Sequence, residues 1–431
     1  MTDLSSQRRA LSTSIRHLKV FDSVAHLHGV RRASDECHIS QPAVTQAIAK
    51  LEEQLGVTLL ERRASGSYLN EFGLIFHRRT RRLFEQFEQA LMELGVPSGP
   101  IPIPQLAARI SRSHIRSFIA IVENGSFAQA ARALGVSQTS LQRAARDLER
   151  TLRVQLYAQT ASGIMATPAA AECARKIKLA LREIECGIDE VEAARGNVGG
   201  EIVIGAMLLA GSEMIATVID EFVTAYPNAH VRMSNGNAED MLRYLRTGDV
   251  DVVIGLLRQS ASEGFVQQIL ADTPYVVVAR EDHPLVNKPN VTLEDLADYD
   301  WIVGTPGATR RIHFDKLFEG RRRPQARIAT CSLPTVRLLL AQSDRLTLLT
   351  SYELLVYGDD ALRAVPFGPI TPVPSLGLTM REGWLPTKLQ SDFIDLVNKR
   401  IVGSLMPEKA LRRLAQASRP PRKLTSAPTN T

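Results

Sequence analysis

The sequence predicts a multidomain protein with two small helix-rich domains in tandem, a long helix and a two-lobed α/β domain. Three observations predict this architecture. A segment near the N-terminus occurs twice, a heptad pattern follows its second copy, and short apolar strands alternate with amphipathic helices over the C-terminal half. A chain of 431 residues also exceeds what one hydrophobic core usually organises.

The duplication is read directly from two stretches. SQPAVTQAIAKLE begins at residue 40 and SQTSLQRAARDLE at residue 137, an offset of 97 positions. Extending the match without gaps pairs Phe21 with Phe118 and Leu51 with Leu148, and it ends at ASG in both copies. Two copies of so short a unit do not make a solenoid. We therefore expect a tandem pair of similar domains.

The second copy has the pattern of a helix-turn-helix. Ser126 and Gln129 form a capping box at the start of one helix, Gly135 suits the turn that follows, and Ser137 caps the next helix. The buried stripe of that helix leaves a polar face outward: Gln138, Thr139, Gln142, Arg143 and Arg146. Gln and Arg are side chains that read base edges in the major groove.

The first copy repeats the pattern, with a polar face of Gln41, Pro42, Thr45, Gln46 and Lys50. A β-rich segment around a glycine follows each copy, at 59–69 and 156–166, and suits a two-stranded wing. Two winged helix-turn-helix domains that bind DNA are the favoured interpretation. Periodicity leaves open a three-helix packing module with a solvated polar face.

An a/d heptad seam follows the second copy: Ile177, Leu181, Ile184, Ile188 and Val191. Two helices would bury such a seam against each other, so we expect a homodimer or homotetramer through it. The alternative is a helix packed on its own domain. A shorter seam follows the first copy, at Phe84, Phe87, Leu91 and Leu94.

From Glu201 onward the alternation of strands and helices predicts parallel sheets in two lobes joined by crossover strands. The expected boundaries are 1–95 for the first winged domain with its trailing helix, 96–111 for a Pro-rich linker, 112–168 for the second winged domain, 169–198 for a dimerising linker helix, 199–404 for the effector-binding domain and 405–431 for a basic disordered tail.

Composition limits the other classes of function. The N-terminus has no apolar core of a signal peptide, and no stretch reaches the length of a membrane helix, which predicts a cytoplasmic protein. A net charge of +6 permits a polyanionic partner without requiring one. No catalytic motif and no cofactor motif is present, so the sequence favours a protein that is not an enzyme. The scattered cysteines predict reduced thiols and no metal site: Cys37, Cys173, Cys186 and Cys331.

The run SQPAVTQAIAKLEEQLGVTLLER (40–62) closely resembles the winged helix-turn-helix of LysR-type transcriptional regulators, and 125–149 is similar. The C-terminal half resembles the periplasmic-binding-protein-like effector domain of that family. Its stretches 331–350 and 378–387 look most like the subgroup of galactose-binding-protein regulators and some aromatic-catabolism regulators. The resemblance implies a ligand-responsive regulator that binds operator DNA. A cytoplasmic solute-binding protein is the alternative from another class.

The first copy keeps four residues that match DNA-contacting positions of the family: Gln41, Pro42, Thr45 and Arg62. It has His38 where the second copy has Gly135, which predicts an imperfect turn. The second copy has Thr139 for the usual proline and Gln159 for the wing arginine. We expect the first copy to supply much of the specific contact and the second to supply geometry and auxiliary contact. The alternative is that the first domain is a protein-interaction or oligomerisation module.

The resemblance also implies a ligand between the lobes, at strand ends. The matching positions are Met207, Leu208, Leu209, Thr305, Thr309, Ser332, Leu333, Thr350 and Ser351. Many family members have Ser or Thr after the first strand to hold a carboxylate, whereas this chain has Met-Leu-Leu. A sugar or an aromatic compound, partly apolar or neutral, is therefore favoured over a ligand held chiefly by its carboxylate.

Overall fold

The computed structural model describes residues 13–97, 103–160, 163–207, 212–258, 262–357 and 361–404. The chain forms two compact units, which we describe separately. The helical unit holds the residues up to Glu201, and the α/β unit holds most of the remainder. Leu208, Leu209, the expected tail at 405–431 and part of the Pro-rich linker lie outside the described residues.

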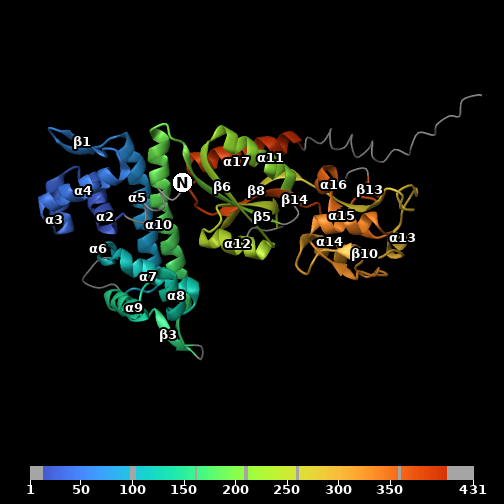
Figure 1. Cartoon of the computed structure of the whole chain (residues 1–431), viewed down its shortest axis with the longest axis horizontal. Coiled ribbons are helices and arrows are strands. Elements are labelled where there is room, and N and C mark those ends of the chain that lie inside the picture. The colour runs from blue at the N-terminus through green and yellow to red at the C-terminus, as the bar shows by residue number, and fades with distance from the viewer. Residues whose placement is uncertain are drawn as a thin grey trace, which may run out of the picture. The chain divides into compact units, whose positions relative to one another are not determined.

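Each copy of the repeat folds into three helices, a hairpin and a long helix (Figure 1). The first copy comprises α2 (Ile15–Leu27), α3 (Val30–Cys37), α4 (Gln41–Leu55), β1 (Leu60–Arg63), β2 (Gly66–Leu69) and α5 (Glu71–Glu93). The second comprises α7 (Arg112–Asn124), α8 (Phe127–Leu134), α9 (Gln138–Leu152), β3 (Tyr157–Thr160), β4 (Gly163–Ala166) and α10 (Pro168–Ala194). A short helix, α6 (Ile103–Arg109), lies between the copies.

The turn between α3 and α4 corrects the expectation for His38. Its backbone is left-handed, with φ of 53°, and its N–H donates to the carbonyls at the end of α3. Gly135, with φ of 66°, closes the turn between α8 and α9 in the same way. Histidine bears a cost of about 1–2 kcal/mol in this conformation, since its Cβ approaches the next carbonyl. The two turns are nevertheless equivalent.

Equivalent hydrogen bonds fix the hairpin to the helices in both copies. The Glu52 carboxylate accepts the Leu59 N–H at 2.7 Å, and the Glu149 carboxylate accepts the Leu156 N–H at 2.8 Å. In each copy the residue that caps the following helix donates its own N–H to the carbonyl of that same leucine. The hairpin and the start of the long helix are therefore held by one local network.

The long helices α5 and α10 pack on each other within the chain. Phe76, Leu83, Phe87 and Leu91 of α5 and Ile177, Ile184, Ile188 and Val191 of α10 belong to one buried cluster that extends through both copies. The predicted heptad seam is thus buried, apart from the half-buried Leu181. Its partner is α5 of the same chain, so the expectation that this seam joins two chains is wrong.

The α/β unit contains two five-stranded sheets. One has the order β6-β5-β7-β14-β8, with β5 (Gly199–Met207), β6 (Asn228–Gly236), β7 (Val252–Leu256), β8 (Phe265–Asp272) and β14 (Ser375–Arg381). The other has the order β11-β10-β12-β9-β13, with β9 (Tyr275–Arg280), β10 (Trp301–Val303), β11 (Ile328–Ala329), β12 (Leu346–Thr350) and β13 (Leu362–Ala364). The two-lobed α/β arrangement is confirmed.

The sheets are mixed rather than wholly parallel. β5 pairs with β7, and β10 with β11 and β12, in parallel, whereas the returning strand β14 runs antiparallel to both of its neighbours. The helices of the two lobes are α11 (Ser212–Ala225), α12 (Ala238–Thr247) and α17 (Lys388–Ser404), then α13 (Leu293–Ala297), α14 (Thr309–Leu317), α15 (Leu333–Ala341) and α16 (Ser351–Tyr357). No helix of the described residues is long and apolar enough to cross a membrane.

Candidate DNA interface and effector site

The polar face of α4 is exposed along its length. Val44, Ile48 and Leu51 are buried in the core, and the side chains expected to contact DNA are exposed: Gln41, Pro42, Thr45, Gln46 and Lys50. Ser40 caps the helix, its hydroxyl accepting the Ala43 N–H at 3.4 Å. Arg62 is exposed on the β1 strand of the hairpin. The first copy therefore presents its predicted contact residues to solvent.

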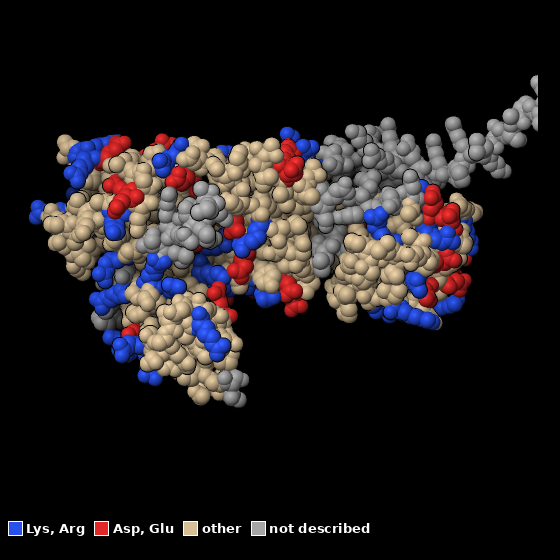
Figure 2. All heavy atoms as spheres, viewed as in Figure 1, with Lys and Arg blue, Asp and Glu red and all other residues tan. Residues whose placement is uncertain are grey.

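The second copy presents a similar but more basic face. Gln138, Thr139, Arg143 and Arg146 of α9 are exposed, and Gln142 is half-buried. Ser137 caps this helix as Ser40 caps α4, accepting the Ser140 N–H at 3.1 Å. Gln159 is exposed on β3, at the place that Arg62 occupies in the first copy. Figure 2 shows many Lys and Arg side chains over the helical unit.

Polar side chains follow the strand ends of the second sheet. Thr305 comes after β10 and is exposed, with its hydroxyl 3.3 Å from the Cys331 sulfur after β11. Ser332 begins α15 and is exposed, and its hydroxyl accepts from Thr335 at 2.9 Å. Thr309 and Ser351 are half-buried at the starts of α14 and α16. The strand order brings the ends of β10, β11 and β12 to one edge.

Two of the predicted effector residues face the interior instead. Leu333 is buried in a cluster with Val336 and Leu340. Thr350 is buried as well, and both its N–H and its hydroxyl donate to the Glu353 carboxylate, at 2.7 and 3.0 Å. Leu333 and Thr350 therefore lie in the interior, beneath the exposed polar residues at the strand ends. Met207 is the last residue of β5, so it lies at the end of the first strand of this unit.

Arg310 is the principal residue that the sequence patterns did not single out. It is 2% exposed, and its Nη2 donates to the Thr330 carbonyl at 3.2 Å. Its Nε and Nη1 have no hydrogen-bond partner among the described residues. Unsatisfied buried donors are rare, and the guanidinium group suits a carboxylate or a phosphate. The TRR sequence after Ala308 was the available signal.

Glu353 lies in the same buried region as Arg310. Burial raises the pKa of the Glu353 carboxyl, while the Arg310 charge and hydrogen bonds from Thr350 act to lower it. The Nε and Nη1 donors of Arg310 do not reach the Glu353 carboxylate or any other hydrogen-bond partner among the described residues. The guanidinium group therefore keeps unused donor capacity at the strand ends of the second sheet.

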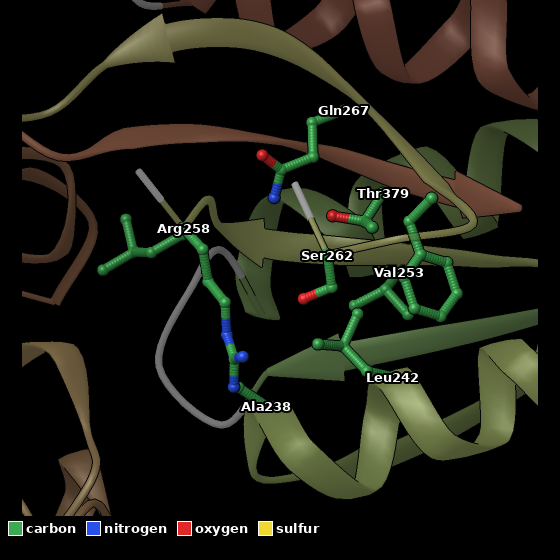
Figure 3. Close-up of a pocket in the computed structure, with 9 residues that line it drawn as sticks. Ala238, Leu242, Val253, Arg258, Ser262, Gln267 and Thr379 are labelled. Carbon is green, nitrogen blue, oxygen red and sulfur yellow. The ribbon is translucent and has the colours of Figure 1, made fainter. Parts of the chain in front are cut away.

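A small pocket lies in the lobe of the first sheet (Figure 3). Its apolar lining is Leu242, Val253, Leu256 and Phe265, and its polar lining includes Arg258, Ser262, Gln267 and Thr379. Arg258 extends toward Ala238 at the start of α12. The enclosed volume of about 20 Å³ is close to the space of one water, so a larger ligand would have to extend out of its mouth.

Family models match most of the chain. One described as "LysR substrate binding domain" matches residues 195–401, and one described as "Bacterial regulatory helix-turn-helix protein, lysR family" matches 15–74 and again 113–171. A DNA-binding module joined to a two-lobed binding domain defines a ligand-responsive transcriptional regulator. The chain belongs to the LysR family.

The chain is also similar to individual regulators and to solved structures. The chain is 28% identical over 376 residues to the HTH-type transcriptional regulator GalR of Pseudomonas putida, covering 86% of this chain and 93% of that protein. It is 29% identical over 238 residues to GbpR of Rhizobium radiobacter, covering 53% and 76%. A full-length OxyR variant from Pseudomonas aeruginosa is a similar solved structure, with 19% identity, a TM-score of 0.48 and coverage of 67% and 93%.

Proposed function

We propose that both copies of the repeat are winged helix-turn-helix domains that contact operator DNA, in a cytoplasmic regulator without enzymatic activity. The observation that carries this proposal is the pair of exposed polar faces on α4 and α9, whose opposite faces are buried in one core. Gln and Arg on these faces suit base edges, and the exposed Arg62 suits a phosphate. The match of one family model to both copies supports the same reading.

The first winged domain is proposed to provide most of the specificity. We expect Gln41→Ala to reduce discrimination between operator and random DNA more than Gln138→Ala does, because a base-edge contact is worth about 1–3 kcal/mol. Arg62→Ala should weaken binding to all sequences alike and reduce the salt slope by about one. Competition binding at several salt concentrations measures both effects. Equal loss of discrimination in the two Gln variants would contradict the division of roles.

We further propose that the effector binds at the strand ends of the second sheet, around Arg310. Thr305, Ser332, Thr309 and Ser351 would surround the ligand, while Leu333 and Thr350 support them from inside. Two unused guanidinium donors favour a ligand with an anionic or strongly accepting group beside its apolar part. Sugar acids and aromatic acids have this chemistry.

A thermal-shift screen of sugar acids and aromatic acids on the full chain tests the effector site. A ligand at a hundred times its Kd stabilises the folded state by about 2.7 kcal/mol. We expect Arg310→Met to abolish the shift and Ser332→Ala to reduce it. Arg321→Ala, which removes an exposed arginine, is the control and should change nothing. Loss of the shift in Arg258→Ala but not in Arg310→Met would move the site to the first lobe.

A further inference from the structure

The pairing of α5 with α10 is antiparallel. Arg79, in the first half of α5, donates to Glu190 near the end of α10 at 3.0 Å, and Arg82, at the middle of α5, donates to Glu183 at 3.1 Å. Glu93, at the end of α5, forms an ion pair with Lys176 near the start of α10. Each hairpin precedes its own long helix. The two copies are therefore attached to opposite ends of one helix pair (Figure 1).

The contacts between α5 and α10 also occur in equivalent pairs when each residue is replaced by its counterpart in the other copy. Shifting by 97 positions turns Arg79 into Lys176 and Glu93 into Glu190. The structure contains both versions of this ion pair, Arg79 with Glu190 and Lys176 with Glu93. Contact between position i and position j, matched by contact between j and i, is the mark of a two-fold interface. Here the interface lies within one chain.

A contact near the middle of the α5 and α10 pair shows where the local two-fold axis passes. Gln86 and Glu183 are equivalent positions under the same offset, and the Gln86 side chain donates to the Glu183 carboxylate at 3.2 Å. Residues at equivalent positions meet only where a two-fold axis passes. Gly187 allows close approach nearby, since a side chain there would lie 3.1 Å from both Phe76 and Arg79. The arrangement of the two copies is thus set by side-chain packing.

The two DNA-facing surfaces at the ends of this pair are not identical. Equivalent positions carry Pro42 and Thr139, then Thr45 and Gln142, then Gln46 and Arg143, then Lys50 and Asp147. Hydrogen-bonding side chains at these places determine which base edges a helix accepts. Two recognition helices that are related by a two-fold axis but carry different side chains match DNA whose two half-sites differ in sequence.

We infer that one chain is a complete two-headed DNA-binding unit, and that its target is a duplex with two inverted, non-identical half-sites bound by a single chain's two winged domains. This inference rests on the proposed function of both domains as DNA readers. To that function it adds that one chain binds one target site, and that the two half-sites of the target differ in sequence. The recognised partner is B-form duplex DNA with two half-sites of different sequence.

The test is a selection from a random-sequence duplex library by the full-length protein, with base preferences read at every position. The wild type should enrich two inverted halves of different sequence, with one chain's pair of winged domains per site in a stoichiometric titration. A Gln41→Ala, Gln46→Ala variant should lower discrimination roughly tenfold or more in one half only. A Gln138→Ala, Arg143→Ala variant should lower discrimination in the other half only, and by a smaller factor.

A gain of symmetry makes the test sharper. Thr139→Pro, Gln142→Thr, Arg143→Gln, Arg146→Ala and Asp147→Lys together give α9 the polar face of α4, and this variant should select an inverted repeat of the first half-site. A wild-type preference for identical halves bound by two chains would overturn the inference, as would relaxation of the same bases by both Ala variants. Enrichment of a single half-site leaves DNA reading intact and removes the two-headed unit. Failure to enrich any duplex removes the proposed function itself.

Discussion

Replacing Arg79 with Ala should lower the free energy of unfolding of the helical unit by about 3–5 kcal/mol, because Glu183 and Glu190 lose their most deeply buried partner and keep the more exposed Arg82 and Arg78. The Arg79 side chain is 1% exposed and contacts both Glu183 and Glu190, each of which is 10% exposed. Urea unfolding followed by circular dichroism measures the change. The matched control is Arg81→Ala on the same helix.

Arg81 forms an ion pair with Glu85, but both side chains are about 60% exposed (62% and 61%), so this substitution should cost less than about 1 kcal/mol. Similar losses in the two variants would mean that the α5 and α10 pairing contributes little to stability. In that case the two copies of the repeat would be held in place by other contacts.

The second large effect is expected from Ile188→Glu. Ile188 is 2% exposed in the cluster shared by α5 and α10, so the change deletes a buried side chain and buries a charge without a partner. Loss of the aliphatic contacts alone costs about 2–5 kcal/mol, and the unpaired charge adds to this. We expect a lower melting temperature and loss of helical signal. Ala194→Glu, at an exposed position of α10, is the control.

Sedimentation distinguishes this outcome from simple dissociation. If the seam joined two chains, the Ile188→Glu protein would sediment as a folded species of reduced mass. Because the seam is closed by α5 of the same chain, we expect partial unfolding or aggregation instead. A folded, dissociated species would contradict the intrachain pairing.

Much of the helical unit could be predicted from the sequence because its periodic patterns are long and occur twice. The duplicated capping residues and apolar stripes predicted α4 and α9 and the orientation of their polar faces. The heptad pattern of α10 predicted burial, but a repeating apolar seam does not specify which helix covers it. The shorter seam at Phe84, Phe87 and Leu91 was the clue to that partner.

Other features could not be predicted because they depend on local backbone energy or on packing between distant segments. His38 takes the left-handed conformation that a glycine adopts in the other copy, at a cost that the surrounding helices offset. Arg79 and Arg310 are buried, which runs against the usual exposure of arginine. The TRR sequence was a signal for Arg310, but no pattern of neighbouring residues marks Arg79 or the burial of either side chain. Their partners come from elements far along the chain.

Cross-linking of the ends of α5 and α10 tests whether these two helices pair within one chain. Glu93→Cys and Lys176→Cys replace an ion pair that is partly exposed, so the fold should tolerate both changes. A short bifunctional maleimide is added to the folded full-length protein, with each single variant as a control for the native cysteines. If α5 and α10 pair within one chain, the cross-linked product migrates at the mass of one chain on a denaturing gel. A product at the mass of two chains would contradict it, since α10 would then pair with α5 of another molecule.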